Sequence, residues 1–287
     1  MQFNKSIINY SYIEKEIPGD NCTVIPVIID DNRYFFKVLN KSMLDKVLLE
    51  ISVVDYLNDK GILVPSYYSK DNKKVFTYEE SIYYGSKEVK GVKASNIVTY
   101  KALESIVENI AKMHKEISNY PIENITCLEK NNDSDRLRKF YKEHKEFLIE
   151  NNLIEYVENL LVKNTSTNRF SIIHSDLNFN NIFIDNGEFS SFIDFTDIKL
   201  GYLEDDLGKL WQNILYLENI NSNELNKLKK IYENVSNQHI DENSLTTSIV
   251  YRIIYRYFCA LDNKENYESN YLDKTKKIIR KVISKEV

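Results

Sequence analysis

The sequence predicts an α+β protein in which a small β-sheet comes before a mainly helical region. Between residues 10 and 39, short runs of β-branched and aromatic residues alternate with turn-forming residues, which is the pattern of antiparallel strands. From about residue 97 onward, apolar residues recur at helical spacing instead. The 43% hydrophobic content of the 287 residues is enough to build a core.

Composition and charge narrow the classes of partner. The net charge of −5 argues against a nucleic-acid binder, which carries a basic patch, and suits a small cationic substrate. We find no apolar run that could span a membrane and no signal-peptide region in the sequence. Cys22, Cys127 and Cys259 are far apart and are interpreted as reduced thiols. We therefore expect a cytoplasmic monomer or dimer that binds neither nucleic acid nor a membrane.

The first strands are expected at residues 12–17, 22–29 and 34–39. The turn at residues 18–21, Pro-Gly-Asp-Asn, contains Gly19 as its one glycine. Such a turn either offers backbone N–H groups to a phosphate or is an ordinary hairpin turn. A helix at residues 42–60, ended by Gly61, should follow. Its apolar stripe consists of Leu44, Val47, Leu48, Ile51, Val54 and Leu57.

Lys37 lies inside the apolar run at residues 34–39. It either faces solvent on the strand or is buried beside a carboxylate, because burying an unpaired ammonium is costly. Glu50 lies on or beside the inward stripe of the next helix, and we prefer it to Asp45 and Asp55 as that carboxylate.

Two more strands are expected at residues 65–68 and 74–78, and residues 79–82 are expected to connect the two regions. An amphipathic helix at residues 97–118 and a charged helical region at residues 133–163 follow. The last helices are expected at residues 222–235, 242–261 and 271–284.

The most informative stretch is residues 172–206. Two short apolar runs, joined by the hairpin signal Asp185-Asn186-Gly187, place Asp176, Asn181 and Asp194 at the ends of strands. Phosphoryl transfer needs positioning and Mg²⁺ more than covalent chemistry. An aspartate can accept the proton of an attacking hydroxyl, and amide and carboxylate oxygens are the hard ligands that Mg²⁺ prefers.

The pattern His174-x-Asp176-x-x-x-x-Asn181, followed by Ile193-Asp194, resembles the catalytic and metal-binding loops of the aminoglycoside phosphotransferase and choline kinase superfamily. The resemblance continues at Asp197, Gly201 and Asp206-Leu207. Three residues depart from the usual pattern: Ser175 and Thr196 replace glycines, and Leu203 replaces a proline.

The resemblance implies a two-lobed protein-kinase-like fold, with a small antiparallel-sheet N-lobe that has one helix and a mainly helical C-lobe. Residues 1–80 would form the nucleotide-binding lobe. Residues 81–287 would carry the catalytic loop and the substrate site.

The resemblance also implies roles for single residues. Asp176 would orient the acceptor hydroxyl and take its proton, and Asn181 and Asp194 would hold Mg²⁺. Lys37, braced by Glu50, would hold the phosphates of ATP or GTP.

Other contacts would be structural or made by the backbone. Gly19 and Asn21 would form a reduced phosphate loop, and the backbone from Glu80 to Ile82 would hold the nucleobase. His174 would hydrogen-bond the loop, Asp206 would brace it, and His114 would pack at a helix end.

The acceptor side is the least determined part. Asp197, Glu204 and Asp205 either attract a cationic substrate or serve surface solvation and helix capping. An aromatic set in the later helices is either core or a cation-binding wall: Trp211, Tyr251, Tyr255, Tyr257 and Phe258.

The leading hypothesis is an antibiotic-modifying kinase of the aminoglycoside type. The alternatives are a kinase for choline or another metabolite, and a catalytically silent nucleotide-binding relative. A protein kinase is disfavoured, because no convincing activation segment with an APE-like end lies between Asp194 and the next helix.

Overall fold

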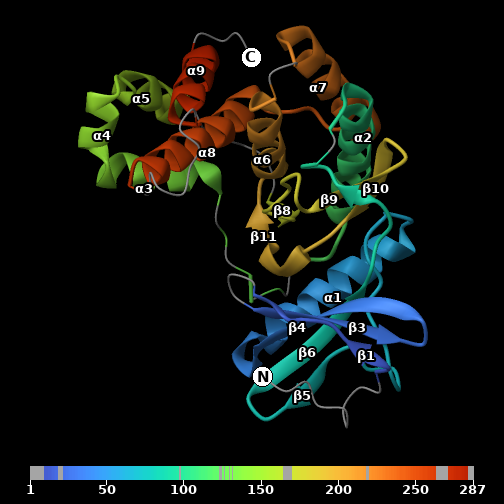
Figure 1. Cartoon of the computed structure of the whole chain (residues 1–287). Coiled ribbons are helices and arrows are strands. Elements are labelled where there is room, and N and C mark those ends of the chain that lie inside the picture. The colour runs from blue at the N-terminus through green and yellow to red at the C-terminus, as the bar shows by residue number, and fades with distance from the viewer. Residues whose placement is uncertain are drawn as a thin grey trace.

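The computed structural model has a sheet-containing N-terminal lobe and a mainly helical C-terminal lobe (Figure 1). The structure describes residues 10–18, 22–96, 98–122, 125, 127–128, 130, 132–163, 170–217, 220–262 and 271–283. Gly19, Asp20 and Asn21, the candidate phosphate-binding turn, lie outside these residues. The predicted α+β, kinase-like arrangement is confirmed.

The N-terminal sheet contains β1 (Tyr12–Ile13), β2 (Ile17–Pro18), β3 (Thr23–Ile29), β4 (Asn32–Asn40), β5 (Phe76–Tyr78) and β6 (Ser81–Lys87). Its strand order is β1-β3-β4-β6-β5, and β2 pairs with β3. Asp30 and Asp31, with φ of 47° and 60°, form the tight turn between β3 and β4, because short polar residues tolerate the left-handed region that such turns need. Lys37 lies mid-strand in β4, in register with Tyr84 of β6.

One helix, α1 (Leu44–Asp59), packs against this sheet after the short 3₁₀ turn η1 (Lys41–Met43). It ends as the sequence predicts. Gly61, at φ 75°, donates to Asn58 O, and Ile62 N donates to Leu57 O, which is the Schellman arrangement. Glu50 is buried on the inner face. Leu48, which we had placed in the apolar stripe, is exposed.

The predicted connection at residues 79–82 is wrong. Glu80 lies in the exposed β5–β6 turn, and Ile82 is a buried residue of β6 that pairs with Leu39. The sheet needs β6 because β6 lies between β4 and β5. The chain therefore leaves the sheet after Lys87. Gly91 (φ 95°) permits a close approach there, since a Cβ at this position would lie 2.2 Å from Ile184 O.

The C-terminal lobe is built on α2 (Tyr100–Ile117), whose predicted apolar face is buried. The charged region expected as one long segment is three helices, α3 (Asp133–Glu143), α4 (Lys145–Glu150) and α5 (Ile154–Lys163). Breaks occur at His144 and near the predicted Asn151-Asn152, where Asn152 has φ 56°. The remaining helices are α6 (Leu203–Leu215), α7 (Ser222–Ser236), α8 (Glu242–Asp262) and α9 (Tyr271–Ile283).

The short strands β8–β11 belong to the C-terminal lobe, on the side of its helices that faces the N-terminal lobe (Figure 1). The β9 (Ile182–Asp185) and β10 (Glu188–Phe192) strands form the predicted hairpin, with Asn186 and Gly187 at positive φ, and β7 (Val92–Lys93) pairs with β9. The β8 (Ser171–Ile173) strand pairs with β11 (Lys199–Gly201). Among the described residues, no helix is long and apolar enough to cross a membrane.

Candidate active site

The loop after β8 is held by one buried carboxylate from α6. Asp206 Oδ2 accepts a hydrogen bond from His174 N (2.8 Å), and Oδ1 accepts one from Ser175 N (2.6 Å). Burial alone would raise the pKa of Asp206, but bonding to His114 and the His114 charge lower it below its usual value. Ser175 has φ 71°, which explains why a glycine suits this position better. The predicted bracing role of Asp206 is therefore what the geometry provides.

His174 holds the loop from the other side. Its Nε2 lies 2.9 Å from Ile193 O, and Asp176 N donates to Nδ1 at 3.3 Å. These two bonds require the tautomer with the proton on Nε2. His174 is fully buried, so it positions the loop beside the segment that leads to Asp194. His114, at 0% exposure, bonds Tyr232 and Asp206, as expected of a packed helix-end histidine.

Asp176 lies at the mouth of this loop with both carboxylate oxygens engaged. Oδ2 accepts hydrogen bonds from the side-chain amides of Asn178 and Asn181, each at 2.8 Å. Oδ1 pairs with Lys209 Nζ of α6 at 3.1 Å. The carboxylate stays about one-third exposed, so a hydroxyl group can reach it.

Asn181 and Asp194 are brought side by side because Ile193 N donates to Asn181 O. The Nδ2 bonds of Asn181 to Asp176 leave its Oδ1 available. Both hydrogen bonds of Asp194 within the described residues use Oδ1, which leaves Oδ2. This pair of hard oxygen donors fits Mg²⁺, which takes few protein ligands and completes its shell with phosphate and water. Asp194 has φ 64°, a costly conformation that aims its side chain.

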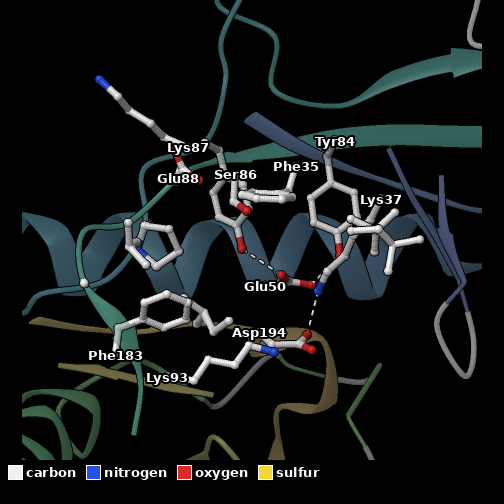
Figure 2. Close-up of a pocket in the computed structure, with 17 residues that line it drawn as sticks. Phe35, Lys37, Glu50, Tyr84, Ser86, Lys87, Glu88, Lys93, Phe183 and Asp194 are labelled. Carbon is white, nitrogen blue, oxygen red and sulfur yellow. Dashed lines mark hydrogen bonds and ion pairs between the residues drawn. The ribbon is translucent and has the colours of Figure 1, made fainter. Parts of the chain in front are cut away.

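Lys37 pairs with Asp194, and this corrects the expected direct pair with Glu50. Its Nζ lies 2.6 Å from Asp194 Oδ1 and also donates to Thr196 Oγ1. Glu50 instead accepts hydrogen bonds from Tyr67 (2.7 Å) and Tyr84 (2.9 Å). Figure 2 shows Lys37, Glu50 and Asp194 around one cleft. Sequence reasoning missed this partner because Asp194 lies 157 residues away.

The charges of this group depend on one another. Burial lowers the pKa of Lys37, but Glu50 and Asp194 outweigh it and raise the pKa above its usual value. Burial raises the pKa of Glu50 although Lys37 opposes it. For Asp194, burial acts upward but the Lys37 ammonium lowers the pKa to about 2. Lys37 and Asp194 are therefore an ion pair at neutral pH, with the buried Glu50 carboxyl group nearby.

The cleft beside Lys37 has a volume of about 330 Å³. Val24 lines the cleft, and Figure 2 shows Phe35 of the sheet on its upper wall and Phe183 and Lys93 on its lower wall. Residues 86–89, the end of β6 and the first residues after it, also line the cleft. Glu80 and Ile82 are not among its lining residues, so the chain borders the cleft at the end of β6 rather than at its start.

The acidic residues expected on the acceptor side do not gather there. Glu204 and Asp205 are 5% and 3% exposed in the first turn of α6. Glu204 accepts a bond from Asp241 N, and Asp205 accepts bonds from Asp133 N and Tyr202 N. Asp197 is largely exposed and lies 3.8 Å from Lys46. The prediction that these acids cap a helix is confirmed for Asp205. The prediction that they are solvated surface residues is wrong for Glu204 and Asp205, because both are buried.

The aromatic set divides between core and surface. Trp211 and Tyr257 are buried in the main core, and Phe258 packs on Phe140 and Phe147. Tyr255 is 47% exposed and stacks on Tyr251. The core interpretation therefore holds for part of the set.

Thr196 and Lys209 are among the residues that contact the site groups but were not identified as site residues from the sequence. Thr196 donates to Asp194 at 2.8 Å and accepts from Lys37. Lys209 reaches Asp176. A signal for Lys209 existed: it lies three residues after Asp206, and residues three apart share a helix face.

The comparisons with known proteins agree with this geometry. The model of the phosphotransferase enzyme family matches residues 19–231, and no curated protein matches. An amicoumacin kinase in complex with AMP-PNP, Ca²⁺ and Ami is 13% identical over 95% of this chain and 88% of its own, with a TM-score of 0.69.

Two further solved structures share the fold. An aminoglycoside phosphotransferase from Alicyclobacillus acidocaldarius is 10% identical over 100% of this chain and 93% of its own (TM-score 0.71). A spectinomycin phosphotransferase in complex with ADP and spectinomycin is 16% identical over 98% of this chain and 94% of its own (TM-score 0.63). The family match over most of the length, on a kinase-like fold, shows that the chain belongs to the phosphotransferase enzyme family.

Proposed function

We propose that this phosphotransferase moves the γ-phosphoryl group of ATP or GTP to a hydroxyl group of a small molecule. The observation that carries the proposal is the convergence of Asp176, Asn181, Asp194 and Lys37 from segments far apart in the chain. A catalytically silent relative would have no physical need for this whole arrangement.

In the proposed reaction the nucleotide occupies the cleft, with its phosphates toward Lys37 and Asp194. Lys37 is charged at neutral pH and neutralises phosphate oxygens. Asp176 orients the acceptor hydroxyl and takes its proton as the oxygen attacks phosphorus. Asn178 and Asn181 hold the Asp176 carboxylate in one orientation.

Asn181 and Asp194 are the residues that would hold Mg²⁺. Bound there, the ion supplies charge neutralisation for the phosphates. Asp194 Oδ1 is paired with Lys37, so Oδ2 is the oxygen that would serve this role. Its low pKa, about 2, keeps the carboxylate ionised as a ligand across the physiological range.

An antibiotic of the aminoglycoside type is the first acceptor to test, because solved proteins of this fold bind kanamycin, spectinomycin and Ami. Choline or another small alcohol is the second candidate. Burial of Glu204 and Asp205 removes two of the three acids that favoured a polycationic acceptor. Asp197 is the one that remains exposed.

The experiment measures release of nucleoside diphosphate with Mg²⁺ and ATP or GTP across aminoglycosides, spectinomycin, choline, ethanolamine and small sugars. Asp176→Asn is the inactive comparison, and Asp185→Asn, a carboxylate-to-amide change at the exposed end of β9, is the matched control. We expect one acceptor to stimulate release in wild type and in Asp185→Asn. We expect Asp176→Asn to lose about 10²–10⁴-fold in turnover while it still binds the nucleotide.

Each outcome decides a different part of the proposal. Stimulation by choline or a sugar alone keeps the mechanism and replaces the antibiotic. Nucleotide binding without release for any acceptor favours the silent relative. Near-normal turnover in Asp176→Asn removes that residue from the chemistry. Unchanged affinity for the Mg²⁺ nucleotide in Asp194→Ala refutes the metal assignment, because that variant should bind it more weakly.

A further inference from the structure

Lys209 is a cation of α6 placed at the reacting end of the site. Its Nζ lies 3.1 Å from Asp176 Oδ1, and its side chain is 23% exposed. Within the described residues, Asp176 is the one hydrogen-bond or ion-pair partner of Nζ. An ammonium has three N–H donors, so two remain for another group.

The two oxygens of Asp176 are not equivalent for an incoming hydroxyl. Oδ2 already accepts bonds from two side-chain amides, those of Asn178 and Asn181. In the part of the chain that the structure describes, Oδ1 contacts Lys209 alone, and it is therefore the oxygen on which an acceptor hydroxyl can bind. A hydroxyl at hydrogen-bond distance, about 2.7 Å from Oδ1, shares this atom with the ammonium.

This sharing brings the ammonium close to the phosphorus that the hydroxyl attacks. The acceptor oxygen and Nζ would both hydrogen-bond to Asp176 Oδ1, so they would be about 3–5 Å apart at ordinary hydrogen-bond angles. In the in-line transition state, negative charge spreads over the three equatorial oxygens of the phosphoryl group. This arrangement would bring at least one of these oxygens within hydrogen-bond distance of Nζ.

The surroundings of Lys209 favour a further anion. Burial lowers its pKa, Asp176 opposes this, and Arg252 and Arg256 of α8 lower it further. Arg252 is neutralised by Asp133 (2.6 Å), whereas Arg256 is exposed. Gly208 lets α8 approach this closely, because a Cβ there would lie 2.0 Å from Ser248 Oγ.

From this placement we propose that Lys209 contacts the phosphoryl group during transfer while it holds Asp176 in place. This role rests on the proposed kinase function and adds a residue to it. In the step, the acceptor O–H gives its proton to Asp176, and the acceptor oxygen forms a bond to the γ-phosphorus. The bond between that phosphorus and the oxygen of the leaving nucleoside diphosphate breaks, with its electron pair staying on that oxygen. Lys209 remains protonated throughout.

The test uses the whole chain and a mimic of the transferring group. Calorimetry measures the Kd of Mg²⁺ with ADP or GDP, whichever binds, before and after addition of aluminium fluoride, which occupies the phosphoryl position. We expect fluoride to tighten binding in wild type and Lys209→Met to lose about 10–100-fold of that tightening. The fluoride-free Kd should stay within about 2-fold of wild type, since Lys209 lies on the acceptor side. Lys209→Arg should restore part of the tightening.

The matched control is Lys229→Met on α7. Lys229 is also a half-buried lysine in a carboxylate pair, with Glu242 at 2.8 Å, and its loss should leave the fluoride effect unchanged. Equal tightening in wild type and Lys209→Met, or no tightening in wild type, overturns the phosphoryl contact. A Lys209→Met protein that loses diphosphate affinity to the same extent also overturns it, because the residue would then be structural. If wild type binds neither diphosphate, the kinase proposal itself is refuted.

Discussion

Two neighbouring aspartates in the first turn of α6 serve two different regions. Asp206 faces the catalytic loop, and Asp205 faces a charged cluster between α3, α8 and β11. Both side chains are almost completely buried. Their pKa values are nevertheless shifted in opposite directions.

Around Asp206, hydrogen bonds and a nearby histidine offset the effect of burial on the carboxylate. Asp206 accepts two backbone bonds and lies 3.3 Å from His114 Nε2. Hydrogen bonds to the ionised form stabilise it, so its pKa is lowered despite burial. Such a carboxylate fixes the loop in one conformation at neutral pH.

In the charged cluster around Asp205, the effect of burial on the carboxylate is not offset. Asp133 and Asp205 lie close together, and Asp133 Oδ1 and Lys199 Nζ lack a hydrogen-bond partner within the described residues. Burial and then the charge of Asp133 raise the pKa of Asp205 to about 8. The comparison teaches that equal burial has opposite consequences for the pKa, because His114 offsets burial at Asp206, whereas the charge of Asp133 adds to burial at Asp205.

Asp206→Ala should have the largest effect. It leaves two buried backbone N–H groups and His114 without their acceptor, which should cost about 3–5 kcal/mol. Denaturant unfolding at pH 7 measures this loss. A loss below about 1 kcal/mol would show that the loop is held by other contacts.

Asp205→Asn should change how stability depends on pH. The folded pKa is raised, so the folded state binds more protons than the unfolded state between about pH 4 and pH 8. Stability therefore falls as pH rises through this window, with a slope of up to about 1.4 kcal/mol per pH unit for one proton. Unfolding of wild type and Asp205→Asn at several pH values tests it. Parallel curves would remove Asp205 as the titrating group.

Asp197→Asn should have the smallest effect on stability. Asp197 is an exposed acid whose nearest cation, Lys46, is 3.8 Å away. Such pairs contribute between about 0 and 1 kcal/mol, so thermal unfolding should change by about 2 °C or less. A larger change would show that Asp197, although exposed, contributes to stability as the two buried acids do. A higher KM for the acceptor, without a loss in stability, would support its substrate role.

The site was predictable where its spacing is local. Asp176 and Asn181 lie in one loop, and their separation alone places both side chains at its mouth. The hairpin turn at Asn186-Gly187 was predictable because these residues tolerate positive φ. The partner of Lys37 was not, because Asp194 reaches it from the other lobe.

The sequence by itself determined that a small sheet comes before a helical region, the turn at Asn186-Gly187, and the spacing of His174, Asp176, Asn181 and Asp194 in residues 172–206. These features depend on local backbone preferences and on apolar periodicity. The tertiary structure alone decided that β6 completes the sheet, that Glu204 and Asp205 are buried, and that Lys209 meets Asp176. The physical reason is that each of these depends on how distant segments pack, and a charged side chain shows no sign in its own neighbourhood of which distant partner it will meet.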